Sequence, residues 1–239
     1  MKDLELIRSV VGQWELDLWS APAVFRPNTT SSLLYENLPP IQGLSILDVG
    51  CGIGPIAIAA ALGGAKKVTA VDVMSEACAL TEKNARLANV DKTVEVQNSF
   101  ALRELGDREF DVIISDISGM SESVARLSPW FPEPIPTGGA DGAELAIEVI
   151  ESARSHLTKN GIMVFPVLSL SSFSLIIETA VRAFPDSLEL VCERRIPMHR
   201  DLVAHSAVLD GLKKEGAIDF STRGSRMCWK IWIYHAMAK

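Results

Sequence analysis

The strongest constraint on the fold is the stretch ILDVGCGIGPIAIAAA, residues 46–61. It combines an apolar strand pattern ending at Val49, three glycines at alternate positions, and Pro55 at the start of a run of alanine and isoleucine. Glycine admits backbone conformations and close approaches that a Cβ would block, and proline suits the first turn of a helix. The stretch therefore predicts a strand, a tight glycine turn over which a ligand binds, and a helix.

The same alternation of strand and helix continues downstream. We expect strands over 45–50, 66–73, 93–99, 110–117 and 162–169, and helices over 55–64, 75–90, 142–161 and 171–184. Strands that alternate with helices at these lengths predict βαβ crossovers and a parallel sheet. Two more strands are expected over 187–196 and 227–238, and the last should be antiparallel because no long crossover helix precedes it. The predicted fold class is α/β, a doubly wound sheet with helices on both faces.

The first 43 residues have a different pattern. Leu4, Ile7, Val11, Trp14 and Leu18 are spaced as on one face of a helix, which predicts an amphipathic helix over 2–19. Prolines then flank a short helical piece over 31–37. We therefore divide the chain into residues 1–43, an N-terminal helix and collar that pack on the core, and residues 44–239, the ligand-binding domain.

Composition excludes several classes of protein. No stretch approaches the roughly 18 apolar residues of a membrane span, and the N-terminus lacks the apolar core of a secretory signal, so we expect a cytoplasmic protein without a membrane partner. The four cysteines lack C-x-x-C spacing, which argues against a metal site. The net charge of −7 disfavours a nucleic-acid partner without eliminating one.

Two cofactors compete for the glycine turn. A dinucleotide fingerprint, G-x-G-x-x-G, needs a third glycine at position 55, which is proline. Asp48, just before the turn, would repel a pyrophosphate but attract an ammonium group. S-adenosylmethionine carries an amino group and a sulfonium but no phosphate, so it fits better. Asp72, at the end of the second strand, suits the ribose hydroxyls of either cofactor.

The residues expected to bind this cofactor lie at the ends of the first four strands of the alternating pattern. Asn98, Ser99 and Phe100 follow the third of these strands, where a polar side chain and an aromatic ring are suited to adenine. The full set is Asp48, Gly50, Cys51, Gly52, Gly54, Asp72, Val73, Asn98, Ser99, Phe100 and Ser115.

From Leu44 to Val167 the chain resembles class I S-adenosylmethionine-dependent methyltransferases, in particular the ribosomal-protein methyltransferases. Two further stretches, VFRPNTTSSLL and GGADGAELAIEVIESARSHLTKNGIMVF, are similar to the release-factor glutamine methyltransferases and other "methyltransferase small domain" proteins. The resemblance implies a Rossmann-like sheet of seven strands, mostly parallel with an antiparallel last strand. It also implies S-adenosyl-L-methionine as cofactor and S-adenosyl-L-homocysteine as product.

The chain departs from the glutamine enzymes at the end of the fourth strand. Those enzymes have Asn-Pro-Pro-Tyr there, whereas this chain has Ser115-Asp116-Ile117-Ser118, and the amine-modifying ribosomal-protein enzymes have a short Asn-Ile that Asp116-Ile117 resembles. Asp116 and Ser118 are therefore the candidate catalytic residues, with Asp116 orienting an acceptor N–H or O–H or accepting its proton.

The predicted function is methyl transfer to a nitrogen or oxygen of an acceptor, either a ribosome- or translation-related protein or a small molecule. A non-catalytic cofactor-binding scaffold and a nicotinamide-dependent oxidoreductase are the alternatives. We expect the long segment 115–139, the N-terminal region, and Trp14, Trp19, Trp130 and Phe131 to enclose the acceptor.

Overall fold

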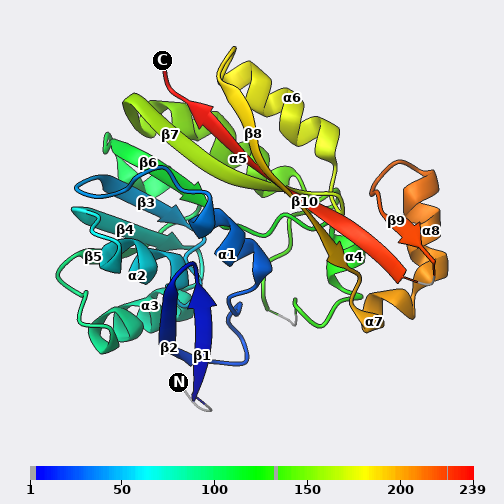
Figure 1. Cartoon of the computed structure of the whole chain (residues 1–239), viewed down its shortest axis with the longest axis horizontal. Coiled ribbons are helices and arrows are strands. Elements are labelled where there is room, and N and C mark those ends of the chain that lie inside the picture. Colours follow the sequence, from blue (N-terminus) through cyan, green and yellow to red (C-terminus); the bar gives the residue numbers. More distant parts are fainter. Residues whose placement is uncertain (1–3, 132–133, 225) are drawn as a thin grey trace.

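The computed structural model describes residues 4–131, 134–224 and 226–239. Its central sheet has the strand order β5-β4-β3-β6-β7-β10-β8, and the short β9 pairs with β10 (Figure 1). Only β10 runs antiparallel to both of its long neighbours, β7 and β8. The mostly parallel sheet of seven strands is thus confirmed, and β9 is added to it. The bounds are β3 (Ser45–Val49), β4 (Lys67–Asp72), β5 (Val94–Asn98), β6 (Phe110–Ser115), β7 (Leu157–Leu168), β8 (Leu188–Pro197), β9 (Ser221–Arg223) and β10 (Arg226–Met237).

Helices cover both faces of this sheet (Figure 1). Adjacent residues of one strand point to opposite faces, so Ile46 joins one hydrophobic cluster and Leu47 the other. The first cluster includes α1, α2 and α3, and the second includes α5 and α6. The bounds are α1 (Thr29–Glu36), α2 (Pro55–Leu62), α3 (Ser75–Leu87), α4 (Glu122–Ala125), α5 (Glu144–Ala153), α6 (Phe173–Ala183), α7 (Arg200–Val203) and α8 (Ser206–Lys214).

The predicted N-terminal helix is wrong. Its described part forms an antiparallel hairpin of β1 (Glu5–Val11) and β2 (Trp14–Ser20), with Val11 opposite Trp14. Gly12 has φ +58° and begins the two-residue turn between them, a position where glycine is favoured. Leu16, Leu18 and Ser20 are buried at every second position, so the apolar residues follow the strand period as well as the helical one.

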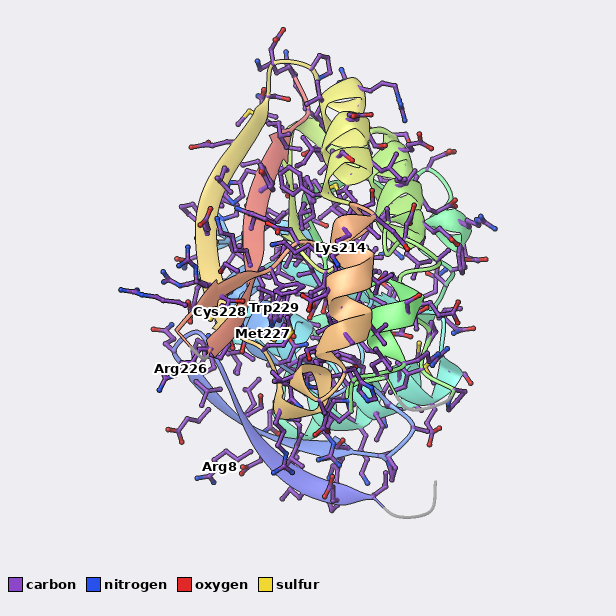
Figure 2. All side chains as sticks on the ribbon, turned by 90° about the vertical axis from the view of Figure 1, so that its right-hand side faces the viewer. Arg8, Lys214, Arg226, Met227, Cys228 and Trp229 are labelled. Carbon is purple, nitrogen blue, oxygen red and sulfur yellow. The ribbon has the colours of Figure 1, made fainter. Side chains whose placement is uncertain are left out.

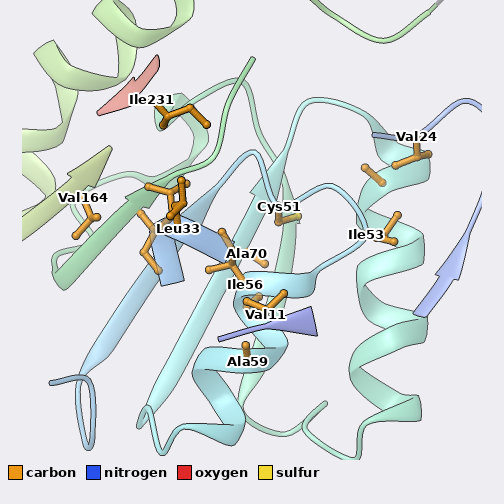
Figure 3. Close-up of a cluster of buried hydrophobic side chains, with 14 of the residues drawn as sticks. Val11, Val24, Leu33, Cys51, Ile53, Ile56, Ala59, Ala70, Val164 and Ile231 are labelled. Carbon is orange, nitrogen blue, oxygen red and sulfur yellow. The ribbon is translucent and has the colours of Figure 1, made fainter. Parts of the chain in front are cut away.

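Asn84 of α3 attaches this hairpin to the domain. Its Oδ1 accepts a hydrogen bond from the backbone N–H of Trp19 at 2.7 Å, and its Nδ2 donates to the carbonyls of Trp19 and Ile53, each at 2.9 Å. On the hairpin's other strand, Val11 lies beside Ile56 and Ala59 of α2 (Figure 3). One buried amide therefore joins the hairpin to the segment that carries the glycine turn.

The helix predicted to run to Gly161 ends much earlier. The α5 helix stops at Ala153, a short 3₁₀ turn follows, and β7 begins at Leu157. The pairing of β7 with β6 shifts in register, because Phe110 faces Leu157 whereas Val112, two residues on, faces Ile162, five residues on. Asn160, with φ +65°, lies inside this irregularity, so the Asn-Gly pair that resembles a helix stop belongs to a bulged strand.

In the part of the chain that the structure describes, no helix combines the length and apolar character needed to cross a membrane.

Candidate active site

A cavity of about 340 Å³ lies at the carboxyl ends of β3, β4 and β6, where open α/β sheets bind their ligands. The cavity is lined by the glycine turn, the start of α1, the segment after β6, and residues of β7, β8 and β10. Nine of the predicted site residues line it: Gly50, Cys51, Gly52, Asp72, Val73, Ser99, Phe100, Asp116 and Ser118.

The glycine turn follows β3 directly. Gly50 has φ +80°, and a Cβ there would lie 2.8 Å from the carbonyl oxygen of Asp116. Gly54, with φ +88°, precedes α2 and packs against Thr81, so it shapes the turn without lining the cavity. Cys51 is buried, and its Sγ lies 3.5 Å from Thr81 Oγ1. At two of its glycines the turn therefore lines the cavity with backbone atoms rather than with side chains.

Asp72 at the tip of β4 braces this turn. Its Oδ2 accepts from the backbone N–H of Gly52, and its Oδ1 accepts from that of Met74, both at 2.9 Å. Burial raises the pKa of Asp72, while these N–H donors act in the opposite direction. Asn98 lies outside the cavity lining, and its side chain donates to the carbonyls of Asp72 and Val73. The Asn98 side chain therefore stabilises the carboxyl end of β4 through these two hydrogen bonds.

Glu104, which the sequence analysis missed, organises the end of β5. One oxygen, Oε2, accepts from Ser99 Oγ at 2.6 Å and from the backbone N–H of Phe100 at 2.9 Å. The hydrogen bond from Ser99 lowers the pKa of Glu104. The ring of Phe100 lines the cavity and lies 4.5 Å from the guanidinium carbon of Arg103.

Asp48 is buried beneath the turn and does not line the cavity. Neither of its carboxyl oxygens has a hydrogen-bond partner in the described part of the chain. Burial, and then the nearby charge of Asp116, raise the pKa of Asp48 well above its ordinary value. Ser115 is likewise buried outside the cavity. Contacts of these two side chains with a cofactor therefore stay predictions.

Asp116 follows β6 immediately and lies beside the glycine turn, with its backbone N–H donating to Val49 O at 2.9 Å. Its Oδ2 accepts from Ser31 Oγ of α1 at 2.6 Å. Burial raises the pKa of Asp116 to about 6, and the Ser31 hydrogen bond moderates that rise. Ser118 lines the same cavity, but its hydroxyl donates to the carbonyl of Pro136. The structure thus shows Ser118 anchoring the loop at Pro136, and the catalytic roles of Asp116 and Ser118 stay predictions.

Comparisons with known proteins agree with this geometry. Residues 28–140 match the family model of the ribosomal protein L11 methyltransferase (PrmA). A Methanocaldococcus jannaschii chain assigned as a protein N5-glutamine methyltransferase is 32% identical over 142 residues, 59% of this chain and 71% of the relative. The ribosomal protein L11 methyltransferase of Methylococcus capsulatus is 40% identical over 113 residues, 47% of this chain and 37% of the relative. This chain belongs to the class I S-adenosylmethionine-dependent methyltransferases.

Membership makes S-adenosylmethionine, rather than a nicotinamide, the cofactor of this methyltransferase. In fold it is similar to the T. thermophilus 16S rRNA N2 G1207 methyltransferase, solved with AdoMet and guanosine, with a TM-score of 0.64 at 16% identity over 99% of this chain and 51% of that one. The Methylococcus match spans well under half of that relative's length.

Four aromatic residues line the cavity and are called the aromatic chamber: Phe25, Trp130, Phe131 and Trp229. The ring pairs Phe25–Phe131 and Trp130–Trp229 have centroids 5.2 and 6.4 Å apart. Figure 2 shows Trp229 near the start of β10, on the side of the molecule where α8 lies. Described residues of the segment 115–139 line the cavity, among them Trp130 and Phe131, and their enclosure of an acceptor stays a prediction. Trp14 and Trp19 do not line the cavity, because Trp14 donates to Tyr35 and Trp19 packs under Lys83.

The N-terminal region was expected to enclose the acceptor, but sequence reasoning named no residue of α1 for the site. Asn28 caps this helix, and its Oδ1 accepts from the backbone N–H groups of Thr30 and Ser31. Asn28, Thr30 and Ser31 all line the cavity. The signal was present, because Asn28 followed by Thr and Ser is a helix-start pattern that places α1 two residues earlier than predicted.

Proposed function

We propose that this methyltransferase transfers a methyl group to an amine nitrogen of its acceptor, and that Asp116 accepts the proton the amine loses. The observation that carries the proposal is the position of Asp116, which lines one continuous cavity with both the glycine turn and the aromatic chamber. The turn fits the cofactor, because a Cβ at Gly50 would fill the space against Asp116. Bound there, S-adenosylmethionine supplies an electrophilic methyl group on a sulfonium.

The charges of the cavity favour an amine. Of the described residues that line it, three carry charge, namely Arg26, Asp72 and Asp116. Arg26 is paired with Glu5, and both oxygens of Asp72 accept backbone N–H groups. Asp116 is therefore the carboxylate that faces the acceptor, and aromatic walls beside a carboxylate attract a cation. With a pKa of about 6, Asp116 is mostly ionised at pH 7 and close to the pKa that suits a general base.

The names of the relatives support a protein acceptor, because they designate enzymes of ribosomal protein L11 and of protein glutamine. We propose a translation-related protein as the acceptor and the cytoplasm as the location. A small-molecule amine is the second candidate, and it is favoured by the burial of chamber residues Phe131 and Trp229. A nucleic acid is disfavoured by the net charge of −7.

The test uses the purified protein, S-adenosylmethionine with a labelled methyl group, and a cell extract separated into protein, RNA and low-molecular-weight fractions. We expect label in one fraction, stable to mild alkali because N-methyl groups survive conditions that hydrolyse methyl esters. Asp116→Asn should reduce transfer by about 10²–10⁴-fold, the range for loss of a general base. The control Asp91→Asn changes an exposed carboxylate outside the cavity and should leave transfer unchanged.

Two outcomes would contradict the proposal. Alkali-labile label would show methyl transfer to a carboxylate oxygen. Cofactor binding without transfer to any fraction would favour the non-catalytic scaffold.

A further inference from the structure

We propose that Ser31 is a positioning residue of this methyltransferase, which holds Asp116 in one orientation through a hydrogen bond from α1. The inference rests on the proposed function for its catalytic consequence. Its structural part stands on the geometry of the Ser31–Asp116 pair. No motif in the sequence connects the two residues, which lie 85 positions apart.

The hydrogen bond is short and shielded. Ser31 Oγ lies 2.6 Å from Asp116 Oδ2, and Ser31 is 2% exposed. Among the described residues, Oδ1 of Asp116 has no hydrogen-bond partner, although Asp116 lines the cavity. One carboxylate oxygen is therefore fixed and the other is left for the acceptor.

The position of Ser31 is itself fixed. Asn28 caps α1 by accepting from the N–H groups of Thr30 and Ser31, at 2.7 and 3.4 Å. The helix is packed on the core through Leu33 and Leu34, which are both buried. A hydroxyl on a capped and packed helix turn loses little freedom when it donates, so it can hold a carboxylate rotamer firmly.

The other charged groups around Asp116 do not replace Ser31. Asp48 on β3 and Asp72 on β4 are carboxyls, which disfavour ionisation of a neighbouring carboxyl. Arg26, before α1, is paired with Glu5, and residues 29–35 of α1 carry no charge. Ser31 therefore supplies the side-chain hydrogen bond that favours the ionised form of Asp116, against burial.

In the reaction, one oxygen of Asp116 takes a proton from the acceptor ammonium, and the amine lone pair forms the new N–CH₃ bond. The S–CH₃ bond breaks with its electron pair remaining on sulfur, so the sulfonium becomes a neutral thioether and the methylated amine carries the positive charge. Ser31 keeps its own proton throughout and contributes only orientation and stabilisation of the carboxylate.

Ser31→Ala tests the proposal, with Ser32→Ala as the matched control and Ser31→Thr as the rescue. Ser32 is the next residue of the same helix, and its hydroxyl donates to Val10 O outside the cavity. In the methyl-transfer assay, Ser31→Ala should lower the rate at least about tenfold near pH 6, since hydrogen bonds to charged groups are among the stronger ones. The acidic limb of the pH–rate profile of Ser31→Ala should move about one pH unit higher than in the parent protein. Ser32→Ala should match the parent protein, and Ser31→Thr should recover most of the rate.

A second measurement needs no acceptor. Carbon-13 NMR titration of the aspartate carboxyls, with the Asp116 signal assigned by its loss in Asp116→Asn, should show a higher pKa of Asp116 in Ser31→Ala than in the parent protein or Ser32→Ala. An unchanged titration and an unchanged acidic limb would overturn the role of Ser31. If no fraction accepts a methyl group while the titration shifts as expected, the proposed function fails and the positioning contact stands.

Discussion

The contact between the glycine turn and the β6 tip can be measured by comparing Gly50→Ala with Gly43→Ala. The two glycines have nearly the same positive φ, +80° for Gly50 and +78° for Gly43. A Cβ at Gly50 would lie 2.8 Å from the carbonyl oxygen of Asp116 and 3.0 Å from Cγ2 of Ile117, whereas a Cβ at Gly43 meets nothing within 4 Å. The pair therefore separates backbone strain from steric overlap.

Both variants should lose about 1–2 kcal/mol of unfolding free energy, the cost of a left-handed conformation for a residue with a Cβ. Gly50→Ala should lose about 1–3 kcal/mol more, because the obstructing oxygen belongs to the backbone and the β6 tip must move away from the turn. The expected totals are about 2–5 kcal/mol for Gly50→Ala and about 1–2 kcal/mol for Gly43→Ala.

Urea unfolding of the two variants and the parent protein measures these differences, and calorimetry with S-adenosylmethionine measures the consequence for binding. Gly50→Ala should weaken the cofactor at least about tenfold, or 1.4 kcal/mol, because the shifted strand tip and the new methyl group both enter its site. Gly43→Ala should bind as the parent does. Equal losses of stability in the two variants, or normal cofactor affinity in Gly50→Ala, would refute the close approach described here.

Three further predictions concern buried polar groups. Folding raises the pKa of Asp116 to about 6, so the folded state binds the proton of this carboxyl more tightly than the unfolded state does. The stability that the protonated Asp116 carboxyl contributes is largest below about pH 4 and is lost as the pH rises through 6. Asp116→Asn should therefore be more stable than the parent at pH 8 by up to about 3 kcal/mol, with the gap closing toward pH 4 in urea titrations; a pH-independent difference would contradict this. Asp72→Asn loses an acceptor for the N–H of Gly52 or Met74 and should weaken S-adenosylmethionine about tenfold or more in calorimetry, and unchanged affinity would remove Asp72 from the ribose site. Asn84→Ala leaves buried backbone groups of Trp19 and Ile53 unpaired and should cost about 2–5 kcal/mol, with amide exchange accelerating in β1 and β2; slow exchange there would show that packing alone holds the hairpin.

The sequence predicted the cofactor half of the protein well because its signals are local. The glycines, Pro55 and Asp72 lie within 23 residues of Gly50, and each is required by a feature of its own turn or strand tip. The errors came where two local patterns fit equally. Ile7 and Val11 are four residues apart, as are Trp14 and Leu18, and this spacing places each pair on one face of either a helix or a strand. Gly12 was the residue that distinguished the two structures, through the turn it begins.

The acceptor half could not be predicted in the same way, because no local pattern joins its residues. The chamber brings together Phe25, Phe131 and Trp229, and the Asp116 carboxylate is held by Ser31 from a helix that precedes the whole sheet. These contacts depend on how the N-terminal region packs onto the domain, which in turn depends on Asn84 and the hairpin. Changes in the N-terminal region can therefore alter the acceptor site while leaving the glycine turn intact, so the cofactor half of this methyltransferase identifies the methyl donor but constrains the acceptor only weakly.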